Sequence, residues 1–123
     1  MPFLSVLPNL YSADVEKSVA FYRDLLGGSE TFRVDGHVEV RIGDVTIAIS
    51  DRGHVAGEGL PAPTQGHPLE LVVWCDSADG ATTALRAAGT PVLVEPYTGH
   101  GHRRAYVTDP DGNWIVLVSK LAA

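Results

Sequence analysis

The sequence predicts an α+β fold, in which two βαβββ modules form a curved, half-open barrel of mixed sheets with the helices outside. Two observations carry this prediction. The same order of strand-like and helix-like stretches occurs twice along the chain, which indicates a structural repeat. A module of this kind leaves one sheet face bare, which favours pairing of the two sheets. Residues 1–123 are expected to form one domain, with module one at 1–50, a linker at 51–66 and module two at 67–123.

Module one begins with a predicted strand at 3–11, where Pro8 indicates an edge or a bulge because it cannot donate a backbone hydrogen bond. A helix follows, since Ser12 or Asp14 can cap its first turn and glycines at 27–28 end it. Its apolar residues recur at helical spacing. They are Val15, Val19, Phe21, Tyr22, Leu25 and Leu26. The remaining strands of the module are predicted at 31–34, 38–42 and 45–50.

Module two repeats this order. A strand is predicted at 69–75, and a helix opens at 76–79 and ends at Gly89. The predicted apolar stripe of this helix is Ala81, Leu85 and Ala88. A short strand is predicted at 91–94, and the following segment, 97–102, reads as a loop.

A hairpin closes the chain and gives its clearest local pattern. Residues 109–112, Asp-Pro-Asp-Gly, form a turn sequence between strands at 105–107 and 114–118. Strand side chains alternate between faces. One face therefore carries Trp114, Val116 and Val118, and the other carries Ile115, Leu117 and Ser119. Both faces are largely apolar, so we expect a helix to cover one of them and a functional contact to cover the other.

Composition narrows the class of partner. The formal net charge of −6 argues against nucleic acid and anionic membranes, since both favour a basic surface. No stretch resembles a secretory signal or a membrane span. A single cysteine, Cys75, cannot form an internal disulfide, which indicates a reducing, cytoplasmic setting. Because Cys75 lies in an apolar run, we interpret it as a small buried hydrophobic residue rather than a nucleophile.

Two motifs carry a family resemblance. Residues 14–27 read D-V-x-x-S-V-x-F-Y-R-x-x-L-G, and residues 109–117 read D-P-D-G-N-x-I-x-L. On these residues the chain resembles the vicinal oxygen chelate superfamily, which includes glyoxalase I, bleomycin-resistance proteins and extradiol dioxygenases. The resemblance covers nearly the whole chain and implies the paired-module fold. It does not indicate the activity, because members of the superfamily catalyse many different reactions and some members only bind ligands.

The resemblance also implies where a metal would be bound. Metal-dependent members place His, Glu or Gln at up to four strand positions, two in each module. Carried onto this sequence, these positions are Leu7, Ile47, Glu70 and Val116. Aliphatic side chains cannot ligate a metal, and one carboxylate alone would not hold a catalytic ion. The expectation is therefore a protein without a metal or other cofactor.

Without metal ligands, the cleft would be mostly apolar with a few polar groups, as is common for small-molecule sites. Strand parity predicts that its lining includes Leu7, Asn9, Ile47, Glu70, Val72, Trp74, Trp114, Val116 and Val118. The two tryptophans could hold an aromatic or cationic ligand between their rings, or could instead fill the core or a dimer interface.

The sequence also contains polar residues that could contribute to ligand binding or catalysis in the cleft. Glu70 could meet a cationic group of a ligand or act as a general base, or could pair internally with Arg104 or Arg41. His102 and Arg104 lie in the segment 97–104, which contains the predicted loop and is a candidate lid or rim of the cleft. Two pairs at i, i+2 spacing could seed a metal site, although a solvated surface is the favoured interpretation. These pairs are His37 with Glu39 and His100 with His102.

The leading prediction is a metal-free, homodimeric small-molecule-binding protein of the glyoxalase and bleomycin-resistance type. It would sequester an aromatic or cationic ligand, such as an antibiotic, in the concave cleft. The alternative is an enzyme of the superfamily, a lyase, isomerase or dioxygenase. Such an enzyme would use Glu70 as base or would recruit His37 or His67 to a non-standard metal site. An accessory domain with an empty cleft is a third possibility.

Overall fold

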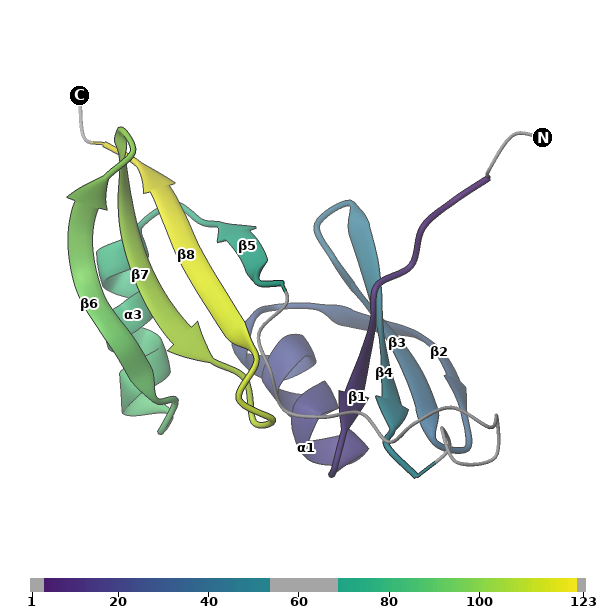
Figure 1. Ribbon diagram of the computed structural model, residues 1–123. Coiled ribbons are helices and arrows are strands. Elements are labelled where there is room, and N and C mark those ends of the chain that lie inside the picture. Colours follow the sequence, from purple (N-terminus) through teal and green to yellow (C-terminus); the bar gives the residue numbers. More distant parts are fainter. Residues whose placement is uncertain (1–3, 54–68, 122–123) are drawn as a thin grey trace. The chain divides into compact units, whose positions relative to one another are not determined.

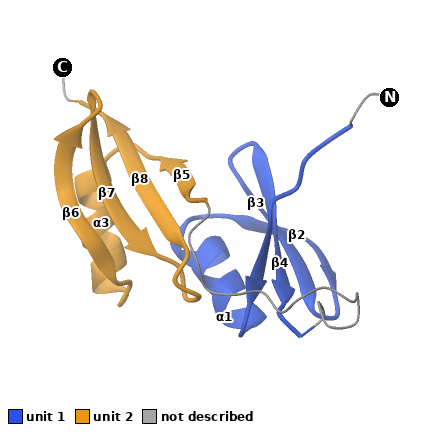
Figure 2. Ribbon diagram, in the orientation of Figure 1, with its two compact units in different colours: residues 1–64 blue, residues 65–123 orange. Residues whose placement is uncertain are grey.

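The computed structural model describes residues 4–53 and 69–121 (Figure 1). The chain divides into two compact units, Met1–Thr64 and Gln65–Ala123 (Figure 2). The division falls inside the stretch that the sequence predicts to be a linker. Each unit has the order βαβββ and one four-stranded mixed sheet, so the predicted α+β fold of two modules is confirmed. Neither described sheet closes on itself, and the half-open barrel that would combine them stays a prediction.

Unit 1 is built around strand β4. Its elements are β1 (Asn9–Ser12), α1 (Val15–Ala20), η1 (Phe21–Leu25), β2 (Ser29–Val34), β3 (His37–Ile42) and β4 (Val45–Asp51). The strand order is β1-β4-β3-β2, in which β1 runs parallel to β4 and the other pairs are antiparallel. The first strand is shorter than predicted. The carbonyl of Pro8 accepts from the Ala48 amide (2.8 Å), but Pro8 donates nothing, and β1 begins only at the next residue.

The first helix changes its winding at its midpoint. Asp14 caps it, as predicted, by accepting a hydrogen bond from the Lys17 amide at 3.1 Å. The helix then widens into the π-turn η1, where the Leu26 amide bonds the Phe21 carbonyl. This extra residue per turn rotates the end of the helix. Leu25, predicted to lie on the apolar stripe, is therefore 42% exposed.

Unit 2 repeats the order around strand β8. Its elements are β5 (Leu71–Trp74), α3 (Ala78–Ala87), β6 (Val92–Gly99), β7 (His102–Thr108) and β8 (Trp114–Lys120), with strand order β5-β8-β7-β6. The buried residues of α3 are Ala78, Thr82 and Leu85, whereas the predicted stripe residue Ala88 is exposed. Thr82 can be buried although it is polar, because its hydroxyl donates to the Ala78 carbonyl (2.7 Å) within the helix. The predicted stripe contained only apolar residues and therefore did not include Thr82.

The predicted loop at 97–102 is wrong, because this segment is a tight hairpin. Strand β6 continues to Gly99, which pairs directly with His102 of β7. The two turn residues, His100 and Gly101, both have positive φ (53° and 78°), which is the backbone that two-residue hairpins require. His102 and Arg104 are therefore fixed in a strand, and the segment offers no lid.

The turn between β7 and β8 is the predicted Asp-Pro-Asp-Gly sequence. The carboxylate of Asp109, only 3% exposed, accepts hydrogen bonds from the Asp111 amide (2.9 Å) and the Asn113 amide (2.7 Å). The Asn113 side-chain amide donates a third bond at 2.7 Å. These contacts satisfy a buried carboxylate and fix the start of β8.

Among the described helices, none is long and apolar enough to cross a membrane.

Replacing Asp109 with alanine is expected to lower the free energy of unfolding by about 2–3 kcal/mol, since the loop amides lose charge-assisted hydrogen bonds inside a buried turn. Urea denaturation measures the change. The matched control is Asp44→Ala in the exposed turn between β3 and β4, where we expect less than about 0.5 kcal/mol. Equal effects of the two substitutions would contradict this account of the turn.

Candidate functional site

In unit 1 the register assigns each strand residue to one of two sheet faces. Arg33 of β2 lies opposite Val38 of β3, and the Arg33 guanidinium forms an ion pair with Glu16 of α1. That face, the helix face of unit 1, therefore packs against the helix. Val38 is paired in turn with Ile49 of β4, so Ile49 shares this face. The opposite face, which we call the open face of unit 1, carries Asn9, Phe32, His37, Glu39, Ala48 and Ser50.

Unit 2 divides in the same way. The Ser119 hydroxyl accepts from the Ala78 amide (2.8 Å), and Arg103 forms an ion pair with Asp79 of α3. These residues mark the helix face of unit 2. The other face, the open face of unit 2, carries Val72, Trp74, Tyr97, His102, Arg104, Tyr106, Trp114, Val116, Val118 and Lys120. No described helix of unit 2 covers this face.

Most of the predicted lining residues lie on these open faces. Val72, Trp74, His102, Arg104, Trp114, Val116 and Val118 share the open face of unit 2, and Asn9 lies on that of unit 1. Glu70 lies two residues before Val72, just ahead of β5, and is half-buried. Leu7 lies ahead of β1 and is 41% exposed. That these residues bind a ligand stays a prediction.

Ile47 is the exception, because it lies on the helix face. Asn9 is paired with Ala48, and Ile47 is the next residue, so its side chain points the other way. Ile47 instead lies opposite Val40 and is 5% exposed. The predicted place of Ile47 in the cleft lining is therefore wrong.

The repeat explains the error. Leu10 and Val73 each lie four residues before the cap of their helix, and they pair with Ile49 and Leu117. Ala48 is therefore the counterpart of Val116. Counting from the turn glycine misplaced the position, since two residues join β3 to β4 but five join β7 to β8. Alanine, like isoleucine, has no atom that can ligate a metal, so this position offers no metal ligand with either residue.

A polar chain on the open face of unit 1 was not predicted. The Ser50 hydroxyl donates to Asn9 Oδ1 (2.8 Å) and lies 2.8 Å from His37 Nδ1. On the other side of the ring, His37 Nε2 lies 2.9 Å from Glu39 Oε2. The sequence indicated only the spacing of His37 and Glu39. Asn9 and Ser50 are 41 residues apart and meet because β1 lies beside β4.

The hydrogen-bond chemistry of this chain restricts where protons lie. With Ser50 donating to Asn9, the Ser50 oxygen accepts from His37 Nδ1–H, and Nε2 faces the Glu39 carboxyl group. If the Asn9 amide is turned to donate, Ser50 donates to Nδ1 and a neutral ring donates to Glu39. In the second arrangement a hydroxyl, an imidazole and a carboxylate are joined donor to acceptor in one line.

Metal-ligating groups do not converge in the described part of the chain. No group of three or more His, Cys, Asp or Glu residues there could hold an ion. His37 and Glu39 bond to each other, His100 lies in an exposed turn, and the His102 ring packs on Trp74. His54 and His67 lie outside the described residues.

Aromatic side chains dominate the open face of unit 2. The ring of Trp74 meets that of His102 edge-on, with centroids 4.9 Å apart, yet Trp74 is 57% exposed. Trp114 is 38% exposed. Neither tryptophan fills a core, because a core indole would be almost wholly buried. Exposed apolar rings on a sheet face are typical of binding surfaces.

Arg104 lies among these rings without a carboxylate partner. Its Nε is buried and makes no hydrogen bond, and its Nη2 donates to the Tyr106 hydroxyl over a long 3.4 Å. Hydrogen bonding to Tyr106, and secondly to Tyr97, raises the pKa of the Arg104 guanidinium above its ordinary value. Among the described residues, no ion pair joins Arg104 to Glu70, so the first of the two internal pairs that the sequence suggested is not formed. The other suggested partner, Arg41, donates to the Gly43 carbonyl instead.

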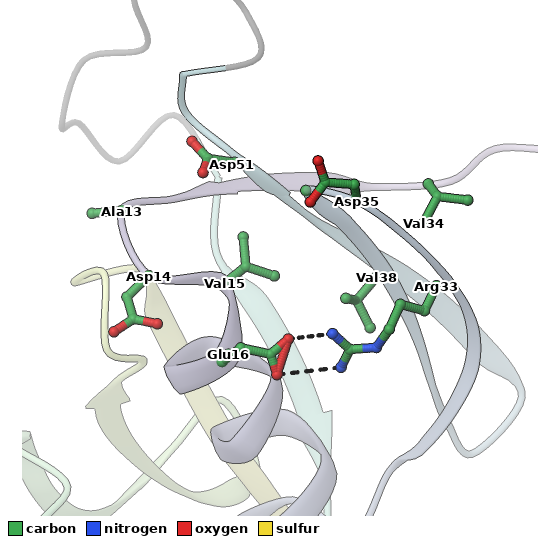
Figure 3. Close-up of a pocket in the computed structure, with 10 residues that line it drawn as sticks. Ala13, Asp14, Val15, Glu16, Arg33, Val34, Asp35, Val38 and Asp51 are labelled. Atoms are coloured by element: carbon green, nitrogen blue, oxygen red, sulfur yellow. Dashed lines mark hydrogen bonds and ion pairs between the residues drawn. The ribbon is translucent and has the colours of Figure 1, made fainter.

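A groove of about 640 Å³ lies on the helix side of unit 1 (Figure 3). Its lining is Ala13, Asp14, Val15, Glu16, Arg33, Val34, Asp35, Gly36, Val38 and Asp51. Four of its five charged side chains form contacts within the protein. Asp14 caps α1, Glu16 pairs with Arg33, and Asp51 accepts from the Gly53 amide. The groove contains none of the predicted site residues, and we assign it a structural role.

Cys75 has the environment of a structural residue. The thiol is half-buried and lies 3.6 Å from the Val118 carbonyl. Burial raises the pKa of the Cys75 thiol above its ordinary value. A thiolate is the reactive form, so this shift disfavours a nucleophilic role.

Removing the Ser50 hydroxyl is expected to lower the free energy of unfolding by about 1–2 kcal/mol, because Asn9 and His37 lose a shared partner in a position that is 6% exposed. Urea denaturation of Ser50→Ala measures the change. Ser29→Ala, at an exposed position of β2, is the control and should change the stability by less than about 0.5 kcal/mol. A Ser50→Ala variant as stable as wild type would contradict the network.

The Cys75 thiol is expected to react with iodoacetamide more slowly at pH 7 than a free cysteine, since its raised pKa leaves less thiolate. The midpoint of the rate against pH should lie above that of the same chain unfolded in urea. A folded-state midpoint below the unfolded one would instead identify an activated cysteine.

Comparison with known proteins agrees with the fold. The family model of the Glyoxalase/Bleomycin resistance protein/Dioxygenase superfamily matches residues 5–117. An uncharacterized protein of Mycolicibacterium smegmatis is 31% identical over 117 residues, which are 91% of this chain and 90% of the relative.

Solved structures of the same architecture belong to proteins with different activities. The lactoylglutathione lyase of Agrobacterium tumefaciens has a TM-score of 0.73 at 22% identity, covering 97% of this chain and 96% of that one. The fosfomycin resistance protein FosX of Mesorhizobium loti has a TM-score of 0.72 at 15% identity, covering 98% and 95%. Identities this low report the fold alone. With both modules, both motifs and a match over residues 5–117, the chain belongs to the glyoxalase/bleomycin resistance protein/dioxygenase superfamily.

Proposed function

We propose that this chain is a metal-free small-molecule-binding protein of the bleomycin-resistance type, which sequesters an aromatic ligand such as an antibiotic on the open face of unit 2. The observation that carries the proposal is the chemistry at the family's four ligand positions. Three of them are occupied by Leu7, Ala48 and Val116, which have no donor atom for a metal. Glu70 at the fourth position is a single carboxylate.

The open face of unit 2 supports an aromatic occupant. Trp74 and Trp114 expose their rings there, and Val72 beside them is 55% exposed. Flat, polarisable rings bind other rings through stacked or edge-on contacts. A homodimer in a reducing, cytoplasmic setting is part of the proposal. The dimer follows from the family resemblance, and the setting from a single cysteine that has no partner for a disulfide.

A second candidate function is a metal-free enzyme of the superfamily, a lyase or isomerase. The polar chain Asn9–Ser50–His37–Glu39 favours it, because a carboxylate and an imidazole in contact can exchange a proton with a substrate. Glu70 is the other candidate base. The structurally similar lactoylglutathione lyase belongs to this class of reaction.

Three probes that share one ring system test the binding function: 2-naphthoate, 2-naphthamide and 2-naphthylmethylammonium. We expect at least one to bind saturably in titration calorimetry, with unchanged affinity after dialysis against EDTA. Trp74→Ala should weaken binding about 3- to 10-fold, the loss typical of one aromatic contact. Leu25→Ala, an exposed apolar residue of η1 in unit 1, serves as the control and should have no effect.

Three results would decide against the proposal. Binding of none of the three probes would contradict it, as would a stoichiometric metal ion in the purified protein whose removal abolishes binding. Recovery of a chemically altered probe, lost in Glu39→Gln or Glu70→Gln but kept in Ser29→Ala, would favour the enzyme.

A further inference from the structure

We propose that Arg104 is the anion-recognition residue of the ligand site, so that the aromatic ligand of this protein carries a carboxylate or a similar acidic group. This inference rests on the proposed binding function and adds the charge class of the ligand. It reverses the cationic alternative that the sequence left open on the basis of Glu70.

The register places Arg104 in the middle of the open face of unit 2. One row of side chains across the sheet runs from Tyr97 on β6 to Arg104 on β7, Val118 on β8 and Trp74 on β5. The guanidinium therefore has a phenol on one side and, beyond one valine, an exposed indole on the other. A ligand ring on Trp74 would bring a substituent towards Arg104.

The Nε–H donor of Arg104 has no acceptor among the described residues, in contrast to the Nε–H of the neighbouring Arg103. Arg103 points to the helix face and donates from Nη2 and Nε to the two oxygens of Asp79, at 2.8 and 3.3 Å. Arg23, Arg33 and Arg86 also form carboxylate ion pairs. In the described residues Arg104 has no such partner, and its buried Nε–H has no acceptor at all. A buried donor without an acceptor is unfavourable and is well suited to one supplied by a ligand.

Neighbouring residues hold the Arg104 side chain in place. The Tyr106 hydroxyl accepts from Nη2, and a Cβ added at Gly99 would lie 2.7 Å from the Tyr97 ring and 3.6 Å from Arg104 Cδ. The absence of a side chain at Gly99 thus makes room for the Tyr97 ring beside the arginine stem. A guanidinium oriented in advance loses less entropy when it binds.

The geometry of the free donors indicates the class of ligand. The Nε–H and one Nη–H of a guanidinium form a planar fork that matches the two oxygens of a carboxylate. Lys120 lies on the same face, opposite His102, and adds a second positive charge to this end of the sheet. Among ligands that share one aromatic ring, the acid should therefore bind more tightly than the neutral or cationic analogue.

The naphthyl series tests this directly, by titration calorimetry on the full chain. We expect 2-naphthoate to bind about tenfold or more tightly than 2-naphthamide, the gain typical of a charge-assisted hydrogen bond. Arg104→Gln should abolish that preference, because it weakens binding of 2-naphthoate at least about tenfold more than binding of 2-naphthamide. Arg103→Gln is the matched control: it changes the adjacent residue on the opposite face and should keep the preference.

A second measurement follows the wild-type chain itself, and a variant is needed only to assign the signal. The ¹⁵Nε–Hε signal of Arg104, identified by its absence in Arg104→Lys, should move downfield with 2-naphthoate and stay in place with 2-naphthamide. Equal binding of acid and amide, or tighter binding of the ammonium probe, overturns the inference and leaves the binding function standing. Binding of none of the probes overturns both. An Arg104 signal that responds to protein concentration but not to 2-naphthoate assigns the face to a second copy of the chain and overturns the inference.

Discussion

The parallel pairing of the first and last strands of each module decides which face every sheet side chain occupies. In unit 1, β1 pairs with β4 so that Asn9 lies beside Ala48, and in unit 2, β5 pairs with β8 so that Val72 lies beside Val116. A slip of one residue would exchange the faces of the whole strand. In unit 1 the helix disfavours that slip, because it covers the apolar residues of one face and the slip would turn the polar Asn9 side chain of β1 towards it.

The two units use the same architecture for different surface chemistry. The open face of unit 1 holds a closed set of hydrogen bonds, from Asn9 through Ser50 and His37 to Glu39, in which each polar group has a partner. The open face of unit 2 holds exposed rings and a guanidinium whose donors are largely unused. Satisfied groups stabilise a surface, whereas unsatisfied ones are available to a ligand. This difference directs attention to unit 2 as the binding surface.

Membership of the superfamily fixes the scaffold and leaves the chemistry to individual residues. Of the four positions that the family resemblance implies for metal ligands, three carry the aliphatic side chains Leu7, Ala48 and Val116, and the fourth carries Glu70. Replacing a ligand by a methyl or isopropyl group also makes the surface more apolar, which suits contact with a hydrophobic guest.

Local sequence determined the elements of this protein. The cap at Asp14, the turn at Asp109 and the alternation along β8 were predictable because each depends on residues a few positions apart. The predicted buried faces of the two helices were wrong at positions where the spacing of apolar residues does not indicate the structure. The π-turn exposed Leu25, and a buried threonine, Thr82, replaced an apolar residue on its helix because its hydroxyl was satisfied internally.

Sequence alone determined the order of elements in two βαβββ modules, which the structure confirms, and the aliphatic residues Leu7 and Val116 at two of the four positions that the family resemblance implies. Tertiary structure decided which residue is the counterpart of Val116, since only the register of β1 against β4 shows that it is Ala48 and not Ile47. It also decided that Ser50 meets His37 and that Arg104 has no carboxylate partner among the described residues. The physical reason is that such contacts depend on strands that are distant in the chain. Spacing along the sequence carries no information about them until the strands are paired.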